Sequence, residues 1–184
     1  MQKIDQETEK KFLEAESFRN NNEFQKAINI FEALLNKVPN FPPILHNLAL
    51  CHIGQNNFQE AEKFYLKCLN IEPVSILSIN NLAKLYFSNK QFKKALPILQ
   101  KSLLKDNNQE DITEINAMCL FESQLKKETN IFCSEALKKF SQNRVIKFTY
   151  GKNLLRSNKH SEGLKYLKES SGMIEFENND VRII

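Results

Sequence analysis

The sequence predicts an all-α protein, built as a right-handed α-solenoid of about five helix hairpins. The main observation is a series of small side chains that recur every 34 residues. One such series consists of Ala15, Ala49, Ala83, Ala117 and Gly151, and another consists of Ala27, Ala61 and Ala95. Repeats of this period are typical of stacked helical units, because each unit buries its apolar face only against its neighbours.

The second helix of each unit is marked by an amphipathic pattern. Apolar residues follow the i, i+3, i+4, i+7 rhythm of a helix over residues 24–38, and the pattern returns over residues 58–69 and 92–103. Pro39 and Pro73 follow the first two of these stretches. A proline forces the residue before it out of the α region. The sequence therefore predicts that the second helices end at equivalent positions.

The first helices are expected close to the start of each unit. They are predicted at residues 8–21, 42–55, 75–89, 110–124 and 144–157. Short polar elbows join each of them to its partner, and elbows this short favour antiparallel hairpins. Phe24, Phe58 and Phe92 come just after an elbow, and we expect them to wedge between the paired helices.

We expect a single repeat domain over residues 8–171. Its units are predicted at residues 8–41, 42–75, 76–109, 110–143 and 144–171. The last two are degenerate, since Lys126 and His160 replace the aromatic residue after the elbow. Pro97 lies inside the second helix of the third unit, on its predicted outer face, and indicates a tolerated kink. In the C-terminal tail, residues 172–184, two apolar segments flank a polar turn and predict a short β-hairpin or the start of a further domain.

The residues that recur within a unit resemble those of the tetratricopeptide repeat (TPR) family. In that family a small residue in the first helix is followed by an aromatic residue, an aromatic after the elbow, an alanine in the second helix and a closing proline. The matching residues are Ala15, Phe18, Phe24, Ala27, Phe31 and Pro39 in the first unit, and Ala49, His52, Phe58, Ala61, Tyr65 and Pro73 in the second. The third unit keeps Leu82, Ala83, Tyr86, Phe92 and Ala95. The resemblance spans about residues 8–171 and points to no subfamily.

Composition argues against several classes of protein. The formal net charge of +4 arises from 26 basic and 22 acidic residues that are scattered along the chain, without the long basic run of a nucleic-acid-binding stripe. No stretch approaches the roughly 18 apolar residues that a membrane span needs, and the N-terminus is polar. We therefore expect a cytoplasmic protein with no membrane partner and little affinity for nucleic acid.

The chain lacks the usual motifs of chemistry. It has no phosphate-binding loop, no dinucleotide fingerprint and no nucleophile elbow, so we predict no catalytic residues, no cofactor and no small-molecule substrate. Four cysteines occupy apolar positions of the helices, and these are Cys51, Cys68, Cys119 and Cys133. His46 and His52 are six residues apart, which does not suit one helical metal site. We therefore expect no metal and no disulfide.

The resemblance implies that the first helices line a concave groove that receives peptides. The candidate groove residues are Phe12, Glu16, His46, Asn47, Leu50, Asn80, Asn81 and Lys84. Some family members hold acidic peptide tails with a clamp of basic residues, but Phe12 and Glu16 occupy two of its positions here. Asn47 and Asn81 are at equivalent positions, and their amides either bond the backbone of an extended peptide or face the solvent. The sequence leaves both readings open.

The sequence thus predicts a noncatalytic scaffold or adaptor that binds a peptide segment of a partner protein. One alternative is the substrate-recruiting N-terminal arm of a larger enzyme, and another is an RNA-binding helical repeat. The apolar residues of the tail also suggest a homo-oligomer that forms through residues 172–184.

Overall fold

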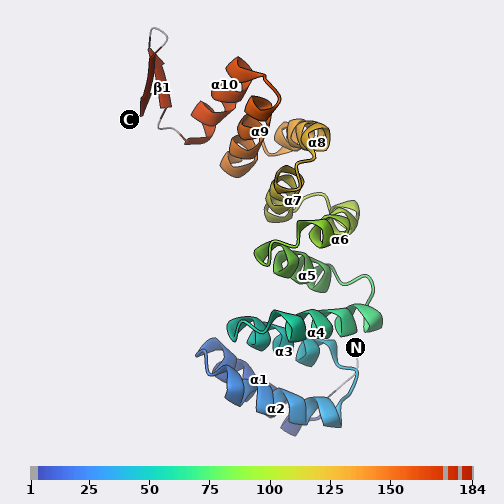
Figure 1. Cartoon of the computed structure of the whole chain (residues 1–184). Coiled ribbons are helices and arrows are strands. Elements are labelled where there is room, and N and C mark those ends of the chain that lie inside the picture. Colours follow the sequence, from blue (N-terminus) through green and yellow to red (C-terminus); the bar gives the residue numbers. More distant parts are fainter. Residues whose placement is uncertain (1–3, 172–173, 178–179, 184) are drawn as a thin grey trace. The chain divides into compact units, whose positions relative to one another are not determined.

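The computed structural model describes residues 4–171, 174–177 and 180–183. It confirms the predicted all-α class, since the described chain forms successive helix hairpins (Figure 1). The first helices of the hairpins are α1 (Gln6–Asn20), α3 (Pro42–Gly54), α5 (Ile76–Ser88), α7 (Glu110–Glu122) and α9 (Arg144–Arg156). The second helices are α2 (Phe24–Lys37), α4 (Phe58–Ile71), α6 (Phe92–Lys105), α8 (Lys126–Lys139) and α10 (His160–Ser171).

The chain divides into two compact units, residues 1–85 and 86–184, and the boundary falls within α5. In the first unit, α1 packs on α2 and α3 packs on α4, while α2 and α3 join the two hairpins. In the second unit, α6 packs on α7, α8 lies between α7 and α9, and α9 pairs with α10. Each unit is therefore a stack of hairpins with its own core.

The elbow of every hairpin contains one residue in the left-handed region. These residues are Asn22, Asn56, Lys90, Gln124 and Asn158, with φ between 56° and 61°. In the first elbow the Glu23 amide donates to the Phe18 carbonyl at 2.9 Å and the Asn22 amide donates to the Arg19 carbonyl at 3.0 Å, which is the Schellman pattern of a helix C-terminus. Asparagine tolerates this backbone conformation better than most residues. The hairpins are thus produced by local chemistry that repeats every 34 residues.

The second helices stop at equivalent positions, as predicted. Val38 and Glu72, which precede the prolines, leave the helical region with φ of −131° and −124°. Helices α6 and α8 end at the same point without a proline, at Asp106 and Phe140. Proline is therefore not necessary for this helix end. Pro97 is exposed within α6, which continues beyond it to Lys105.

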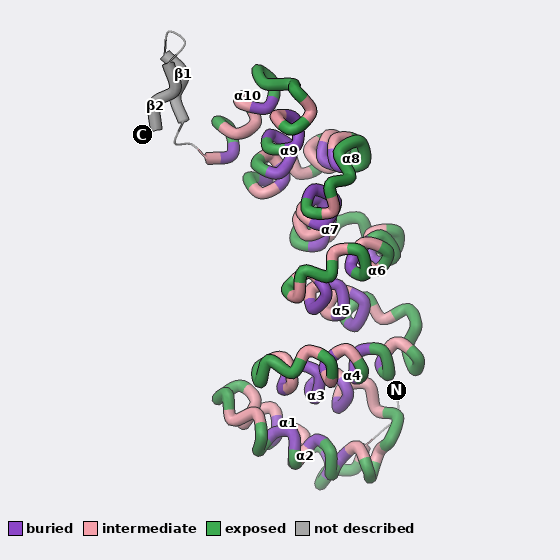
Figure 2. The backbone as a smooth tube through the Cα atoms, in the orientation of Figure 1, coloured by how far each residue is buried: buried purple, intermediate pink, exposed green. Residues whose placement is uncertain are grey.

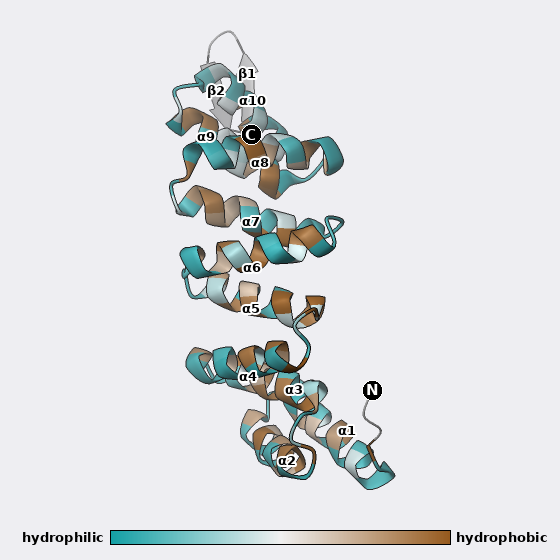
Figure 3. Cartoon of the chain, turned by 90° about the vertical axis from the view of Figure 1, so that its right-hand side faces the viewer, coloured by the Kyte–Doolittle hydropathy of each residue, from teal (hydrophilic) through white to brown (hydrophobic). Residues whose placement is uncertain are grey.

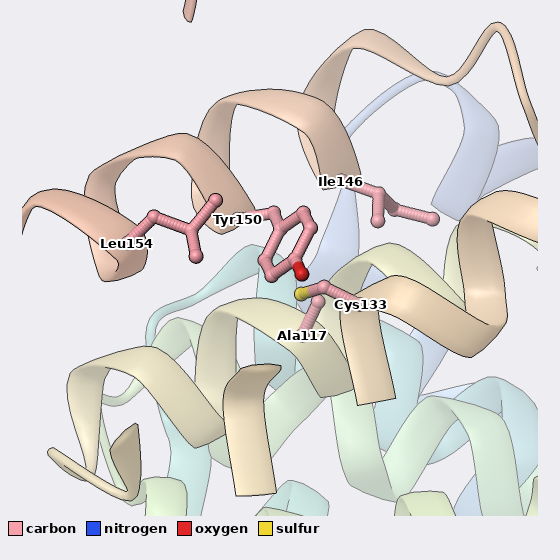
Figure 4. Close-up of a cluster of buried hydrophobic side chains, with 5 residues drawn as sticks. All are labelled: Ala117, Cys133, Ile146, Tyr150 and Leu154. Atoms are coloured by element: carbon pink, nitrogen blue, oxygen red, sulfur yellow. The ribbon is translucent and has the colours of Figure 1, made fainter. Parts of the chain in front are cut away.

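The alanines that recur every 34 residues are fully buried. Figure 2 shows buried and exposed segments alternating along each helix, as expected for helices that pack on one side. In the second unit, a buried cluster joins α7, α8 and α9 (Figure 4). It consists of Ala117, Cys133, Ile146, Tyr150 and Leu154.

The place of Phe24 between α1 and α2 stays a prediction, but this residue contacts the next hairpin. Its half-buried ring lies against Gly54 in the last turn of α3, since a Cβ atom on Gly54 would be only 2.3 Å from the ring. This contact links the start of α2 to the end of α3. At the C-terminus, β1 (Ile174–Glu177) pairs antiparallel with β2 (Asp180–Ile183), with Ile174 opposite Ile183.

Candidate functional site

A cavity of about 540 Å³ lies in the first unit between α1, α3 and the first turn of α5. Four of the predicted groove residues line it: Phe12, Glu16, His46 and Asn47. The other lining residues are Asn40, Phe41, Pro42, Pro43, Ile71, Glu72, Ser75, Leu77 and Ser78. The structure therefore brings half of the predicted set to one place.

One wall of this cavity is aromatic. The Phe12 ring packs edge-on against Phe31 and Phe41, with ring centroids 5.6 Å and 6.4 Å apart. Pro42 and Pro43 follow Phe41 and begin α3, a position where a missing amide hydrogen does no harm. The wall is preformed because its rings are held by the hairpin core.

The lining also includes a polar network centred on Asn47, which is only 3% exposed. Arg19 donates from Nη1 to Asn47 Oδ1, and Asn47 Nδ2 donates to Glu16 Oε1 at 3.3 Å and to the Pro43 carbonyl at 3.0 Å. The amide thus bridges a cation and an anion of α1 from its place on α3. A second lone pair on Oδ1 is left for a further donor.

His46 lies beside this network and is held neutral. Burial lowers the pKa of the imidazole, the nearby Arg19 charge lowers it further, and Glu16 opposes the shift. Its Nδ1 atom is buried without a hydrogen-bond partner in the described structure. His46 therefore contributes a neutral imidazole to the lining of the cavity.

The remaining predicted residues do not line the cavity. Leu50 is half-buried one turn further along α3, and Asn80, Asn81 and Lys84 are half-buried on α5. Asn47 and Asn81 also differ from each other, because Asn47 is almost fully buried whereas Asn81 is partly accessible. A ladder that runs through both amides stays a prediction.

Sequence reasoning missed Arg19, Phe41, Leu77 and Ser78. Arg19 follows Glu16 by three residues on α1 and could have been identified as its helical neighbour. Phe41 and Leu77 carry no comparable signal, since one lies in a connection and the other is an exposed leucine. Their role becomes visible only when the ends of α3 and α5 are placed beside α1.

The four cysteines are buried, as their apolar positions predict, and they are free thiols in the structure. Burial raises the pKa of Cys51 and Cys68 to about 11 and that of Cys119 and Cys133 to about 12. Within the described part of the chain, no three His, Cys, Asp or Glu side chains group as ligands for a metal ion. None of the described helices combines the length and the apolar character that a membrane span requires.

Comparison with known proteins places these features in a family. Two tetratricopeptide repeat models match the sequence, one over residues 20–76 and one over residues 76–105. No curated protein matches the chain significantly.

Several solved structures share the fold. MamA (41-end) from Desulfovibrio magneticus RS-1 is 12% identical with a TM-score of 0.84, and the alignment covers 92% of this chain and 96% of that one. YrrB, described as a TPR protein with an unusual peptide-binding site, is 16% identical with a TM-score of 0.75, over 85% of this chain and 80% of that one. At such identities the similarity establishes the fold alone. The sequence matches show that residues 20–105 are tetratricopeptide repeats, and the solved structures share their hairpin fold over most of the chain.

Proposed function

We propose that this chain is a noncatalytic scaffold that holds a peptide segment of a partner protein in the cavity between α1, α3 and α5. The observation that carries the proposal is that packed aromatic rings and a hydrogen-bonded polar network line the same cavity. Recognition sites of this kind bury an apolar side chain and orient it through a few polar groups. The tetratricopeptide repeats support a protein partner in general.

The cavity chemistry favours an extended segment with an apolar anchor. An aliphatic or aromatic side chain would pack against Phe12 and Phe41, while peptide amides would donate to Glu16 or to the free lone pair of Asn47. His46, as a neutral imidazole, adds a polar contact without a charge. A cluster of acidic residues in the peptide would be unfavourable, because Glu16 and Glu72 both line the recess.

We extend the site along α3 and α5 through the other predicted residues. Leu50 would continue the apolar surface, and Asn80, Asn81 and Lys84 would contact the peptide beyond the cavity. The unpaired cysteines support a reducing compartment such as the cytoplasm. Association of copies through residues 172–184 is a separate proposal, which sedimentation of the full chain would test.

A displayed library of random peptides provides the test. The full chain should enrich peptides with an apolar anchor, and their affinity should fall at least about tenfold in Leu77→Asp, because a charge at the cavity rim is desolvated on binding. Aspartate suits the fold at this position, since Asp111 is its equivalent in the next repeat. Gln59→Ala, on the exposed side of α4, is the matched control and should bind normally.

Two outcomes would contradict the proposal. Enriched peptides that bind Leu77→Asp as tightly as the unchanged chain would place the site elsewhere. Binding of RNA with a steep salt dependence, in place of peptides, would instead favour an RNA-binding repeat.

A further inference from the structure

The second unit contains a larger cavity, of about 700 Å³, which we call the α6–α8 groove. One wall is α6 between Leu96 and Leu104, and the other runs from Leu125 along α8 to Glu135 and includes Glu128 and Ile131. Buried Asn116 and Leu120 of α7 form its floor. Figure 3 faces the side of the molecule on which α6 and α8 lie, and both helices carry apolar segments there.

Two wall residues depart from the pattern of the repeat. Leu104 is 88% exposed and Ile131 is 67% exposed, so neither is needed for the core. Positions equivalent to Leu104 hold Asn36, Asn70 and Lys138, and positions equivalent to Ile131 hold Asn29, Lys63, Pro97 and Lys165. The fold therefore accepts polar residues at both positions, and also a proline at the position of Ile131. Among these equivalent positions, large apolar side chains occur only at Leu104 and Ile131, on the walls of this groove.

The floor departs from the pattern in the opposite direction. Asn116 is fully buried, whereas equivalent positions in three other repeats hold Leu48, Leu82 and Tyr150. Its Oδ1 atom accepts no hydrogen bond from the described part of the chain. A buried acceptor without a donor destabilises the fold, and a leucine at this position would avoid that loss. The asparagine thus points to a hydrogen-bond donor that comes from outside the chain.

The charges of the groove specify that donor. Glu128 and Glu135 are the charged residues among those that line it, and no lysine, arginine or histidine is among them. Lys94 and Lys101 occupy the equivalent positions in the preceding repeat. In a chain with 26 basic and 22 acidic residues, an apolar groove whose charged lining is purely acidic favours a cationic donor.

We propose that the α6–α8 groove binds an amphipathic helix of a partner protein, with an apolar stripe and a lysine or arginine beside it. The lining runs from Leu96 to Leu104 on α6 and from Leu125 to Glu135 on α8, which corresponds to two or three turns at about 1.5 Å per residue. A helix satisfies its own backbone hydrogen bonds, whereas an extended peptide would leave many unpaired against these apolar walls. The stripe would contact Leu104 and Ile131, and the cation would contact Glu128 and Asn116.

The test uses a displayed library of peptides about four turns long. Leucine recurs in them at i, i+3, i+4 and i+7, and the other positions vary among alanine, glutamine, glutamate and lysine. The full chain should enrich peptides with lysine beside the stripe. Leu104→Asn and Ile131→Lys should each weaken binding of the selected peptides at least about tenfold, because each removes an apolar side chain that the bound helix would bury. Both substitutions copy residues of equivalent positions, and a thermal melt checks that they fold.

Two further variants sharpen the result. Leu66→Gln is the matched control, because Leu66 is 43% exposed on α4 outside the groove and its equivalent position holds Gln100; it should bind normally. Asn116→Leu should raise the melting temperature and weaken peptides with the lysine more than peptides in which that lysine is replaced by alanine.

The following outcomes would overturn the proposal. The library shows no enrichment, or it enriches acidic peptides, or the selected peptides bind both Leu104→Asn and Ile131→Lys with full affinity. Sedimentation tests for a different occupant of the groove. If the unchanged chain is a dimer that Leu104→Asn dissociates, a second copy of the chain covers the groove, and the helix of a partner does not.

Discussion

Gly151 of α9 and Gly163 of α10 pack backbone against backbone. A Cβ atom on Gly151 would lie 2.8 Å from the carbonyl oxygen of Gly163, and one on Gly163 would lie 2.9 Å from that of Gly151. The equivalent pairs in the first three repeats consist of alanines: Ala15 with Ala27, Ala49 with Ala61, and Ala83 with Ala95. The fifth hairpin is thus closed more tightly than a pair of methyl groups would permit.

Gly151→Ala should destabilise the chain although alanine occupies this position in every other repeat. The substitution gains about 1 kcal/mol of helix propensity but forces a methyl group onto a backbone oxygen, and overpacking costs about 1–3 kcal/mol. We expect a lower melting temperature. Ala117→Gly, the reverse change in α7, should also lower it, because it leaves a void. A higher melting temperature for Gly151→Ala would mean that α9 and α10 separate freely.

Gly54→Ala should be destabilising in a way that depends on Phe24. The new methyl group would overlap the Phe24 ring, whose nearest atom is 2.3 Å from the Cβ position. Phe24→Leu removes that ring and should reduce the loss caused by Gly54→Ala. Chemical denaturation of the two single variants and the double variant measures this coupling. If the changes in unfolding free energy are additive, the contact between Gly54 and Phe24 contributes no coupling free energy.

Asn47→Ala should lower the free energy of unfolding by about 1–3 kcal/mol, because it leaves Arg19 and the Pro43 carbonyl without their partner. Asn81→Ala, at the equivalent position of α5, should have a smaller effect since its side chain is partly accessible. Urea titration of both variants provides the measurement. Equal effects would contradict the network as described.

Stability should fall when the pH is lowered from about 7.5 to about 5.5. The folded state lowers the pKa of His46 and of His52, in both cases mainly through burial. The unfolded state then binds more protons, so this stability is present above the ordinary histidine pKa and is lost as the pH falls towards the lowered value. His46→Asn, which copies Asn80, should weaken the pH dependence, and adding His52→Phe, which copies Phe18, should weaken it further. Thermal melts between these pH values measure how steeply stability changes with pH. An unchanged slope in the double variant would show that other titrating groups cause it.

The native thiols should react slowly with a thiol reagent near neutral pH. All four cysteines are buried, and burial raises the pKa of Cys133 to about 12, so the reactive thiolate is scarce. The reaction should accelerate sharply in urea as the helices open. Fast labelling of any cysteine without denaturant would show that its hairpin opens readily.

The helix boundaries were largely predictable because local chemistry dictates them. The 34-residue spacing, the polar elbows and the closing prolines act within a few residues of each helix end, and the second helices do begin at Phe24, Phe58 and Phe92. The elbows show why this works without identical residues. Lys90 and Gln124 take the same left-handed conformation as Asn22, because the hydrogen bonds of the helix C-terminus require it.

The candidate sites depended on contacts that no local pattern encodes. The sequence by itself determined that Asn47 lies on a first helix, but the neighbouring hairpin decided that its amide is buried between Arg19 and Glu16. It also determined that residue 151 must be small, whereas the approach of α10 decided that even alanine is too large. The physical reason is distance: packing and burial are set by side chains about one repeat apart, and only the tertiary structure brings them within a few ångströms.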